Sequence, residues 1–241
     1  MIGWPARESS GRAFTLVELL VTVAILSVLV GLLLPALADV RGAADSSACA
    51  LRQRQVVIAC LSYADENDGQ SPALGVPWGR RPFWALEAAS RLGVRGETTA
   101  ELYAGASNIL VCQGARRVAG IDLERTDAIN VTGHAGASGS GSDPADPDDF
   151  DAGLAHIDLY RVASPSSVAL LIDATWTDAA SDGPPRTRFL STIDYRNDEH
   201  VATRIGYWHP DDRSNWTAVD ASVRALRLGD AVDPRWSLPL P

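Results

Sequence analysis

The first residue of chemical interest is Glu18, a single carboxylate at the start of a long apolar run. From Leu19 to Ala38 the sequence carries no charged residue. A carboxylate deep in a bilayer costs on the order of 2.5–3.5 kcal/mol on insertion scales, and less near the interface. Because a lone charge in a medium of low dielectric is penalised and a paired charge is stabilised, the chemistry expected of Glu18 is ion pairing.

Pro35 lies near the far end of the same run. Proline cannot donate a backbone hydrogen bond, and its ring crowds the carbonyl four residues earlier, here that of Gly31. Gly31 itself weakens a helix by about 1 kcal/mol relative to alanine. The sequence therefore predicts a kink, or a section that can melt locally, between Gly31 and Pro35. A tolerated membrane kink without a role is the alternative.

The run that holds both residues is long enough to cross a membrane. About 20 apolar residues at about 1.5 Å rise per residue match the roughly 30 Å thickness of the hydrocarbon core. Arg7 and Arg12 precede the run, which places the short N-terminus inside and the rest of the chain outside. A cleaved secretory signal is the main alternative, because Ala36 and Ala38 form an AxA-like site. A soluble core helix is rarely so uniformly apolar.

The stretch AFTLVELLVTVAILSVLVGLLLPAL closely resembles the N-terminal motif of type IV prepilins and type II secretion pseudopilins. In that family a short basic leader is cut just before a phenylalanine, which is then N-methylated. The resemblance implies a leader of residues 1–13, cleavage by a prepilin peptidase between Ala13 and Phe14, and methylation of the Phe14 amine. Glu18 and Pro35 then stand where the family pattern has them, whereas Ala13 replaces the usual glycine.

The resemblance also supplies a partner for Glu18. Cleavage creates a positive amine on Phe14, one helical turn before the carboxylate. In an assembling bundle, Glu18 of one subunit can meet the Phe14 amine of its neighbour, so the buried acid would set the register of assembly. The partners implied are other pilin or pseudopilin subunits and the inner membrane.

Beyond Ala38 the helical pattern continues in amphipathic form, until Gly69 and Pro72 end it. A single helix from about residue 14 to residue 66 would be near 80 Å long at 1.5 Å per residue. Its second half is available to pack under a globular head. One stripe of this half consists of Ala44, Ala48, Leu51, Gln55, Ile58 and Ser62, with Arg41, Asp45, Arg52 and Arg54 as polar neighbours.

The sequence thus predicts an α+β pilin-like fold, with a long N-terminal helix packed against a head that contains an antiparallel β-sheet. The expected parts are a leader (1–13), a transmembrane and assembly half (14–38), an amphipathic half (39–69) and an extracytoplasmic head (70–241). Within the head we expect a helix at 81–93, strands at 108–112 and 166–176, an antiparallel pair at 202–209 and 216–228, and a Gly/Ser/Asp/Pro loop at 134–151.

The C-terminal stretch YWHPDDRSNWTAVDASVRAL resembles the end of a large pilin-like group from planctomycetes, and NILVCQ resembles a strand end of that group that contains cysteine. In the group a histidine is followed about nine residues later by Asp-Gly. Here ten residues separate His209 from Asp220, and Ala221 takes the place of the glycine. A role for His209 and Asp220 therefore carries over only loosely.

The head contains no familiar catalytic or metal-binding motif. The four histidines are scattered without an HExxH pattern, and no G-x-S-x-G, P-loop or GxGxxG pattern is present. Asp173 ends an expected strand but has no paired base or nucleophile. Some pseudopilins bind calcium, yet the oxygen ligands of the 146–151 segment fit a solvated acidic loop better: Asp146, Asp148, Asp149 and Asp151. We expect no enzyme, metal site or cofactor.

The net charge of −9, without a basic cluster interleaved with aromatic residues, argues against a nucleic-acid partner. Three cysteines, Cys49, Cys60 and Cys112, permit one disulfide and form no zinc-type cluster. Cys49 and Cys60 lie roughly 16 Å apart along one helix, too far for a bridge, which needs Cα atoms within about 7 Å. We expect a Cys60–Cys112 bridge, because Cys60 lies nearer the head; three free thiols are the alternative.

Three functions are compatible with these features. The first is a filament subunit, a pilin or pseudopilin of a type IV pilus or type II secretion machine. The second is a minor or tip pilin-like binding module, which the size of the head keeps open, and the third is a membrane-anchored periplasmic enzyme. For the first, we expect a single-pass protein of the bacterial inner membrane with a cytoplasmic N-terminus and a periplasmic head, which reaches a filament or the cell surface after assembly.

We predict that the mature protein begins at Phe14 and keeps its apolar segment, because the sequence RAFTLVE places the cut between Ala13 and Phe14. Mass spectrometry of the purified protein should find residues 14–241 with a methyl group on the Phe14 amine. A mature protein that begins at Asp39 would instead support a cleaved signal peptide.

Overall fold

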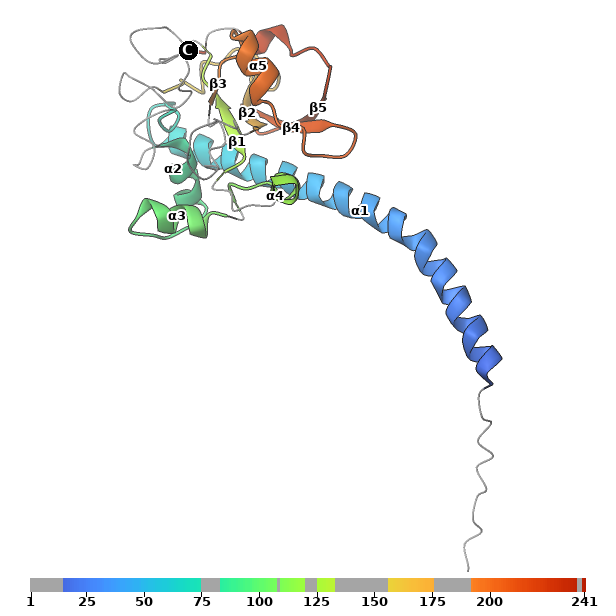
Figure 1. The fold of residues 1–241 in the computed structure, drawn as a ribbon. Coiled ribbons are helices and arrows are strands. Elements are labelled where there is room, and N and C mark those ends of the chain that lie inside the picture. The colour runs from blue at the N-terminus through green and yellow to red at the C-terminus, as the bar shows by residue number, and fades with distance from the viewer. Residues whose placement is uncertain are drawn as a thin grey trace, which may run out of the picture. The chain divides into compact units, whose positions relative to one another are not determined.

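A computed structural model describes residues 15–74, 83–107, 109–119, 125–132, 156–175, 192–237 and 240–241 (Figure 1). The chain divides into two compact units, residues 1–41 and residues 42–241. Ala13 and Phe14, the positions of the predicted cut and methylation, lie outside the described residues, and so does the predicted loop at 134–151.

The long N-terminal helix is confirmed. Helix α1 runs from Leu16 to Asp65 and includes Pro35. It ends where the sequence predicts, because Gly69 takes a positive φ of 85° and its amide donates to the Ala64 carbonyl at 2.9 Å. Glycine adopts this left-handed conformation at little cost, and this makes it a frequent residue just after a helix.

The stripe of α1 described in the sequence does not pack against the head. All six stripe residues are exposed. The buried residues of the helix lie on another face and include two polar ones: Cys49, Arg52, Gln53, Val56, Val57, Ala59, Cys60 and Ala64. The sequence pattern misleads here because Arg52 and Gln53 have buried partners on the sheet, which makes their burial favourable.

The head is built on a five-stranded sheet with the order β3-β1-β2-β4-β5. All neighbouring pairs are antiparallel except β1 with β3. The α+β arrangement of a long helix and a mostly antiparallel sheet is therefore confirmed. The strands are β1 (Asp127–Asn130), β2 (Ala169–Asp173), β3 (Thr192–Ile193), β4 (Arg213–Ala218) and β5 (Val223–Arg227).

Apolar side chains of β1 and β2 divide between two hydrophobic clusters. Ile129 of β1 and Leu171 of β2 belong to the cluster that contains Val56 and Val57 of α1. Ala128 and Ile172, their neighbours in sequence, belong to a second cluster together with aromatic residues, namely Tyr195, Trp216 and Trp236. Since successive strand side chains point to opposite faces, one face of the sheet packs on α1 and the other packs on this aromatic cluster.

Among its described residues the head also has four short helices, α2 (Trp84–Arg91), α3 (Thr99–Gly105), α4 (Gln113–Ala119) and α5 (Asp198–Arg204), and a 3₁₀ turn at Pro234–Ser237. The helix predicted at 81–93 is confirmed by α2. Its Arg91 pairs with Glu66, just beyond α1, and with Glu87 of its own helix. The strand predicted at 166–176 is confirmed as β2, although Trp176 lies outside the described residues.

The strand predicted at 108–112 does not form within the described residues of that segment. After α3 the chain turns, because the amides of Ile109 and Leu110 both donate to the Ala106 carbonyl. Thr126 satisfies backbone groups of this segment instead of a neighbouring strand. Its amide donates to the Leu110 carbonyl, and its hydroxyl accepts from the Cys112 amide at 2.7 Å. The apolar run was a correct sign of burial but not of strand structure.

The antiparallel pair predicted between residues 202–209 and 216–228 was also wrong. The side chain of Asn197 accepts hydrogen bonds from the amides of Glu199 and His200, and this cap starts helix α5 where part of a strand was expected. The antiparallel pair is formed by β4 and β5 alone. Their turn includes Ala221, whose φ is 64°, so the predicted single strand at 216–228 is in fact most of a hairpin.

Candidate functional site

The apolar part of α1 exposes its side chains along its whole length. Every residue from Leu16 to Arg41 is exposed, and an 18-residue window of this helix reaches a mean hydropathy of 2.7 with none of it buried. The two hydroxyls in this part are satisfied by the helix itself: Thr22 donates to the Leu19 carbonyl and Ser27 to the Val23 carbonyl, both at 2.8 Å. Such a helix is suited to a lipid environment or to packing against other apolar helices.

Glu18 closes the N-terminus of this helix. Its carboxylate accepts hydrogen bonds from the amide and the hydroxyl of Thr15 at 2.9 Å, while its own amide donates to the Thr15 hydroxyl at 3.2 Å. Thr15 and Glu18 thus form a reciprocal capping box, in which the carboxylate also faces the positive end of the helix dipole. The sequence TLVE carries this signal, which our sequence analysis missed.

Helix α1 continues through Gly31 and Pro35. Because Pro35 has no amide proton, the Gly31 carbonyl lacks its normal helical donor. A Cβ added to Gly31 would meet no atom within 4 Å, so no contact within the described chain requires a glycine there. The predicted kink or local melting at Gly31–Pro35 stays a prediction.

In the head, two carboxylates face each other across the sheet. Asp127 of β1 and Asp173 of β2 are directly paired in the antiparallel register, and both are fully buried. Like charges opposite each other on adjacent strands repel, and burial removes the water that would screen them. These two residues therefore need donors from elsewhere in the fold.

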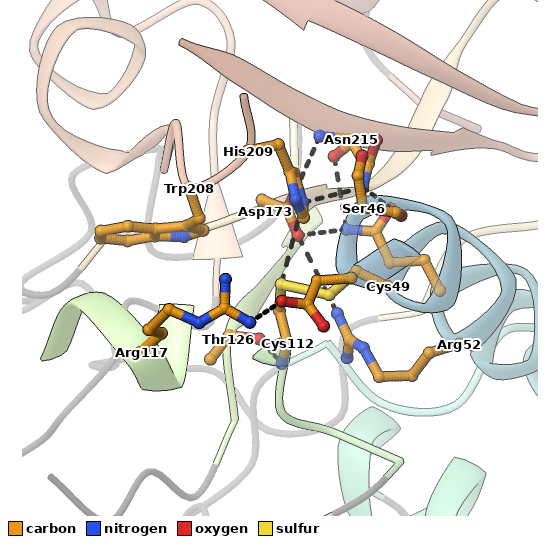
Figure 2. The surroundings of a disulfide bond; sticks show 12 residues. Ser46, Cys49, Arg52, Cys112, Arg117, Thr126, Asp173, Trp208, His209 and Asn215 are labelled. Carbon is orange, nitrogen blue, oxygen red and sulfur yellow. Dashed lines mark hydrogen bonds and ion pairs between the residues drawn. A yellow bond between two sulfur atoms is a disulfide. The ribbon is translucent and has the colours of Figure 1, made fainter. Parts of the chain in front are cut away.

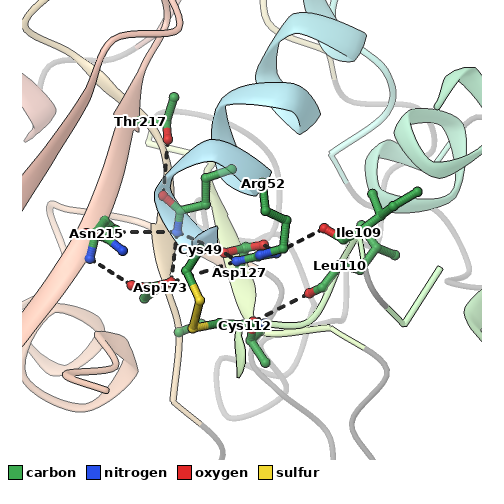
Figure 3. A network of polar contacts seen from close by, with 12 residues as sticks. Cys49, Arg52, Ile109, Leu110, Cys112, Asp127, Asp173, Asn215 and Thr217 are labelled. Carbon is green, nitrogen blue, oxygen red and sulfur yellow. Dashed lines mark hydrogen bonds and ion pairs between the residues drawn. A yellow bond between two sulfur atoms is a disulfide. The ribbon is translucent and has the colours of Figure 1, made fainter. Parts of the chain in front are cut away.

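Helix α1 supplies those donors (Figure 3). Both terminal nitrogens of Arg52 donate to the Asp127 carboxylate, one of them at 2.8 Å, and the same guanidinium lies 3.9 Å from an Asp173 oxygen. The amide nitrogen of Gln53 donates to Asp127 and to Asp173, each at 2.9 Å, and its oxygen accepts from Thr217 of β4. Burial alone would lower the pKa of Arg52, but the charge and hydrogen bonds of Asp127 raise it above its usual value.

His209 and Asn215 complete the shell around Asp173. The other Asp173 oxygen lies 2.9 Å from His209 Nε2 and accepts from the Asn215 backbone amide at 2.7 Å. Desolvation raises the pKa of Asp173, and the hydrogen bond with His209 partly offsets this rise. An aspartate–histidine pair is able to act as a general base, but these side chains are almost completely buried. The geometry assigns them to holding the sheet and α1 together.

One disulfide lies beside this network (Figure 2). It joins Cys49 of α1 to Cys112, with Cα atoms 5.2 Å apart, so the predicted Cys60–Cys112 bridge was wrong. The prediction assumed that only the end of α1 reaches the head, whereas buried residues of the helix begin at Cys49. Cys60 is a buried free thiol in a separate cluster, and burial raises its pKa to about 12.

His209 and Asp220, linked in the sequence analysis by the second resemblance, lie at opposite ends of strand β4. His209 forms a bridge with Arg213, at the start of the strand. The Asp220 carboxylate accepts from the Ser222 amide at 2.9 Å in the β4–β5 turn. Ala221 has the positive φ that favours glycine, so Asp220 and Ala221 belong to a turn and Asp220 is not a partner of His209.

Comparison with known proteins gives a match for the N-terminal segment of the chain. Residues 9–34 match the family model of the prokaryotic N-terminal methylation motif. The chain carries a type IV prepilin-type N-terminus. The match includes Ala13, Phe14, Glu18 and Gly31, and it ends just before Pro35. No curated protein and no solved structure matches the chain.

The match covers only the N-terminal part of the chain and does not extend to the head. The role of the head must therefore come from its own residues. Asp127 could have been suspected from the sequence, because both DAIN and LLID place an aspartate at one end of an otherwise largely apolar segment. The partnership with Arg52 could not, because nothing in a single sequence connects positions so far apart.

We predict that Arg52→Met destabilises the head by about 3–5 kcal/mol, because it leaves two buried carboxylates without their cation. The measurement is urea unfolding of the mature protein in detergent, followed by tryptophan fluorescence. Arg54→Met is the matched control: it alters an exposed arginine of the same helix and should change the free energy of unfolding by about 0.5 kcal/mol or less.

A second substitution tests whether uncompensated charge causes the loss of stability in Arg52→Met. Adding Asp127→Asn to Arg52→Met removes one of the two uncompensated charges and should recover part of the loss, by about 1–3 kcal/mol. A cost below about 1 kcal/mol for Arg52→Met, or no recovery in the double variant, would show that the ion pair does not hold the head on α1.

Proposed function

We propose that this protein is a pilin-like structural subunit, processed by a prepilin peptidase and assembled into a type IV pilus or a type II secretion pseudopilus. The observation that carries the proposal is the methylation motif at residues 9–34, which includes most of the exposed apolar part of α1 and precedes a folded head. Phe14 is the proposed first residue of the mature chain and the site of N-methylation. The apolar part of α1 is the proposed anchor in the inner membrane.

The disulfide supports a head outside the cytoplasm. Cys49–Cys112 is buried and joins two parts of the chain 63 residues apart. Such bridges form and persist in oxidising compartments and are rare in the cytosol. Together with Arg7 and Arg12 before the membrane segment, this favours a periplasmic head and a cytoplasmic N-terminus.

The exposed stripe of α1 supports assembly through this helix. Within the head unit, Leu51 is 63% exposed and Ile58 is 48% exposed, and the other members of the stripe are small or uncharged: Ala44, Ala48, Gln55 and Ser62. A helix face of this composition gains from burial against a neighbour. We assign it to contact with other subunits in the filament.

We predict that Glu18→Ala and Glu18→Gln are both processed and inserted into the membrane but are poorly incorporated into filaments. Glutamine retains the capping box with Thr15 and loses only the charge, so the pair of variants separates the two roles of Glu18. If pairing with the Phe14 amine of a neighbour sets assembly, glutamine should fail about as completely as alanine.

The measurement is the amount of subunit in sheared filaments relative to the amount in the membrane. Glu97→Ala, which removes an exposed carboxylate from the head, serves as the control and should assemble normally. Normal assembly of Glu18→Gln with failure of Glu18→Ala would leave Glu18 as a helix cap only.

We further predict that Ile58→Glu impairs assembly without unfolding the head. The side chain is exposed in the single chain, so the free energy of unfolding should change by about 0.5 kcal/mol or less. A carboxylate buried between packed helices, in contrast, is strongly unfavourable. Leu228→Glu places the same charge at another exposed apolar residue, near the end of β5, and should assemble normally. Equal incorporation of both variants would rule out this face.

A further inference from the structure

The disulfide of the head lies against a histidine (Figure 2). Cys49, Cys112 and His209 each offer one ligand atom, and these three atoms lie within 4.8 Å of one another. The residues come from three separate parts of the fold: the middle of α1, the position just before α4, and the segment that leads into β4. All three are buried.

The hydrogen bonds of His209 leave one of its ring nitrogens without a partner. Nε2 lies 2.9 Å from an Asp173 oxygen, 2.8 Å from the Asn215 side-chain nitrogen and 3.8 Å from the Cys112 sulfur. Nδ1 is buried and has no hydrogen-bond partner among the described residues. In the tautomer that a carboxylate favours, Nε2 donates its proton to Asp173 and Nδ1 carries a free lone pair; the Asn215 side-chain nitrogen then donates to the Ser46 carbonyl instead.

An imidazole with one nitrogen held by a carboxylate and a lone pair on the other is the usual form of a histidine that binds a metal ion. Gly114 keeps the space beside this lone pair clear. A Cβ added to Gly114 would lie 3.4 Å from both the Cys112 sulfur and His209 Nδ1, and 3.1 Å from the Trp208 carbonyl oxygen.

We propose that, when the disulfide is reduced, Cys49, Cys112 and His209 bind one zinc ion, with Asp173 orienting the imidazole. Two thiolates and an imidazole are a donor set that zinc prefers. Two thiolates on one tetrahedral zinc ion lie about 3.8 Å apart, given Zn–S bonds of about 2.3 Å. The two sulfur atoms of a disulfide lie roughly 2 Å apart. To bind one zinc ion they therefore need to move apart by less than about 2 Å.

The charges and electrons of the exchange balance. A phosphine reductant breaks the S–S bond, takes up the oxygen of one water molecule to become a phosphine oxide, and leaves two thiols. Zn²⁺ then displaces the two thiol protons to solvent and forms two Zn–S bonds. The charge of the ion cancels that of the two thiolates, so the net charge buried beside Asp127, Arg52 and Asp173 is the same as in the oxidised form.

The test uses the full mature chain in detergent. The protein is unfolded in urea with a phosphine, which makes the buried disulfide accessible, and refolded with Zn²⁺ or with Co²⁺, whose thiolate complexes absorb in the near ultraviolet. We expect one metal ion per chain, sulfur-to-cobalt absorption and a dissociation constant below about 1 µM. The oxidised protein, treated identically without the phosphine, should bind none.

Two variants test the ligand set, with tryptophan fluorescence as the check that each chain is folded. His209→Asn should weaken metal binding by 10-fold or more. Cys60→Ser, which removes the buried thiol of the other cluster, should bind as the unaltered chain does.

Three results would overturn the proposal: a folded, reduced chain with three free thiols and no bound metal, unchanged affinity in folded His209→Asn, or loss of binding in Cys60→Ser. If His209→Asn fails to fold, the comparison of the reduced and oxidised forms of the unaltered chain still decides the question.

Discussion

The head of this protein contains two neighbouring buried carboxylates that are stable side by side only with donors from another part of the fold. Asp127 and Asp173 face each other on adjacent strands inside the protein, where their repulsion is not screened. Arg52 and Gln53 of α1 make this arrangement stable. The two carboxylates therefore have their hydrogen-bond donors only when α1 packs on the sheet. This explains why Arg52 and Gln53 lie on the buried face of the helix.

This constraint connects the other features of the head. His209 and Asn215 satisfy the remaining oxygen of Asp173, and the Asn215 side chain also donates to the Ser46 carbonyl of α1 at 3.3 Å. The disulfide fixes the same stretch of helix covalently. Three kinds of interaction, ionic, hydrogen-bonded and covalent, thus hold a short segment of α1 in one position. These interactions fix the position of this segment of α1 relative to the sheet.

The sequence was sufficient where the signal is local. The exposed apolar segment, the extent of α1, helix α2 and strand β2 all follow from hydropathy and periodicity over a few turns or residues. The N-terminal motif likewise lies within a single short segment. The capping box of Thr15 and Glu18 was equally local and could have been recognised.

The sequence was insufficient where a residue depends on partners far along the chain. Arg52 and Gln53 look like surface residues until they are joined to carboxylates 75 and 120 positions away. With their burial, a face of α1 other than that of Leu51 and Ile58 lies toward the sheet. The packing of the head on α1 also extends back to Cys49, which is why Cys49 rather than Cys60 lies next to Cys112.

The contact at Gly42 has a practical consequence for preparing a soluble fragment. A Cβ at this position would lie 2.9 Å from the ring of Pro210, so the packing of the head already begins at the first residue of the second unit. A truncation after the end of α1, which would look natural as a boundary between stem and head, removes the cation, the amide and one cysteine on which the sheet depends. An expression fragment should instead start at or before Arg41, in the solvent-exposed part of the helix.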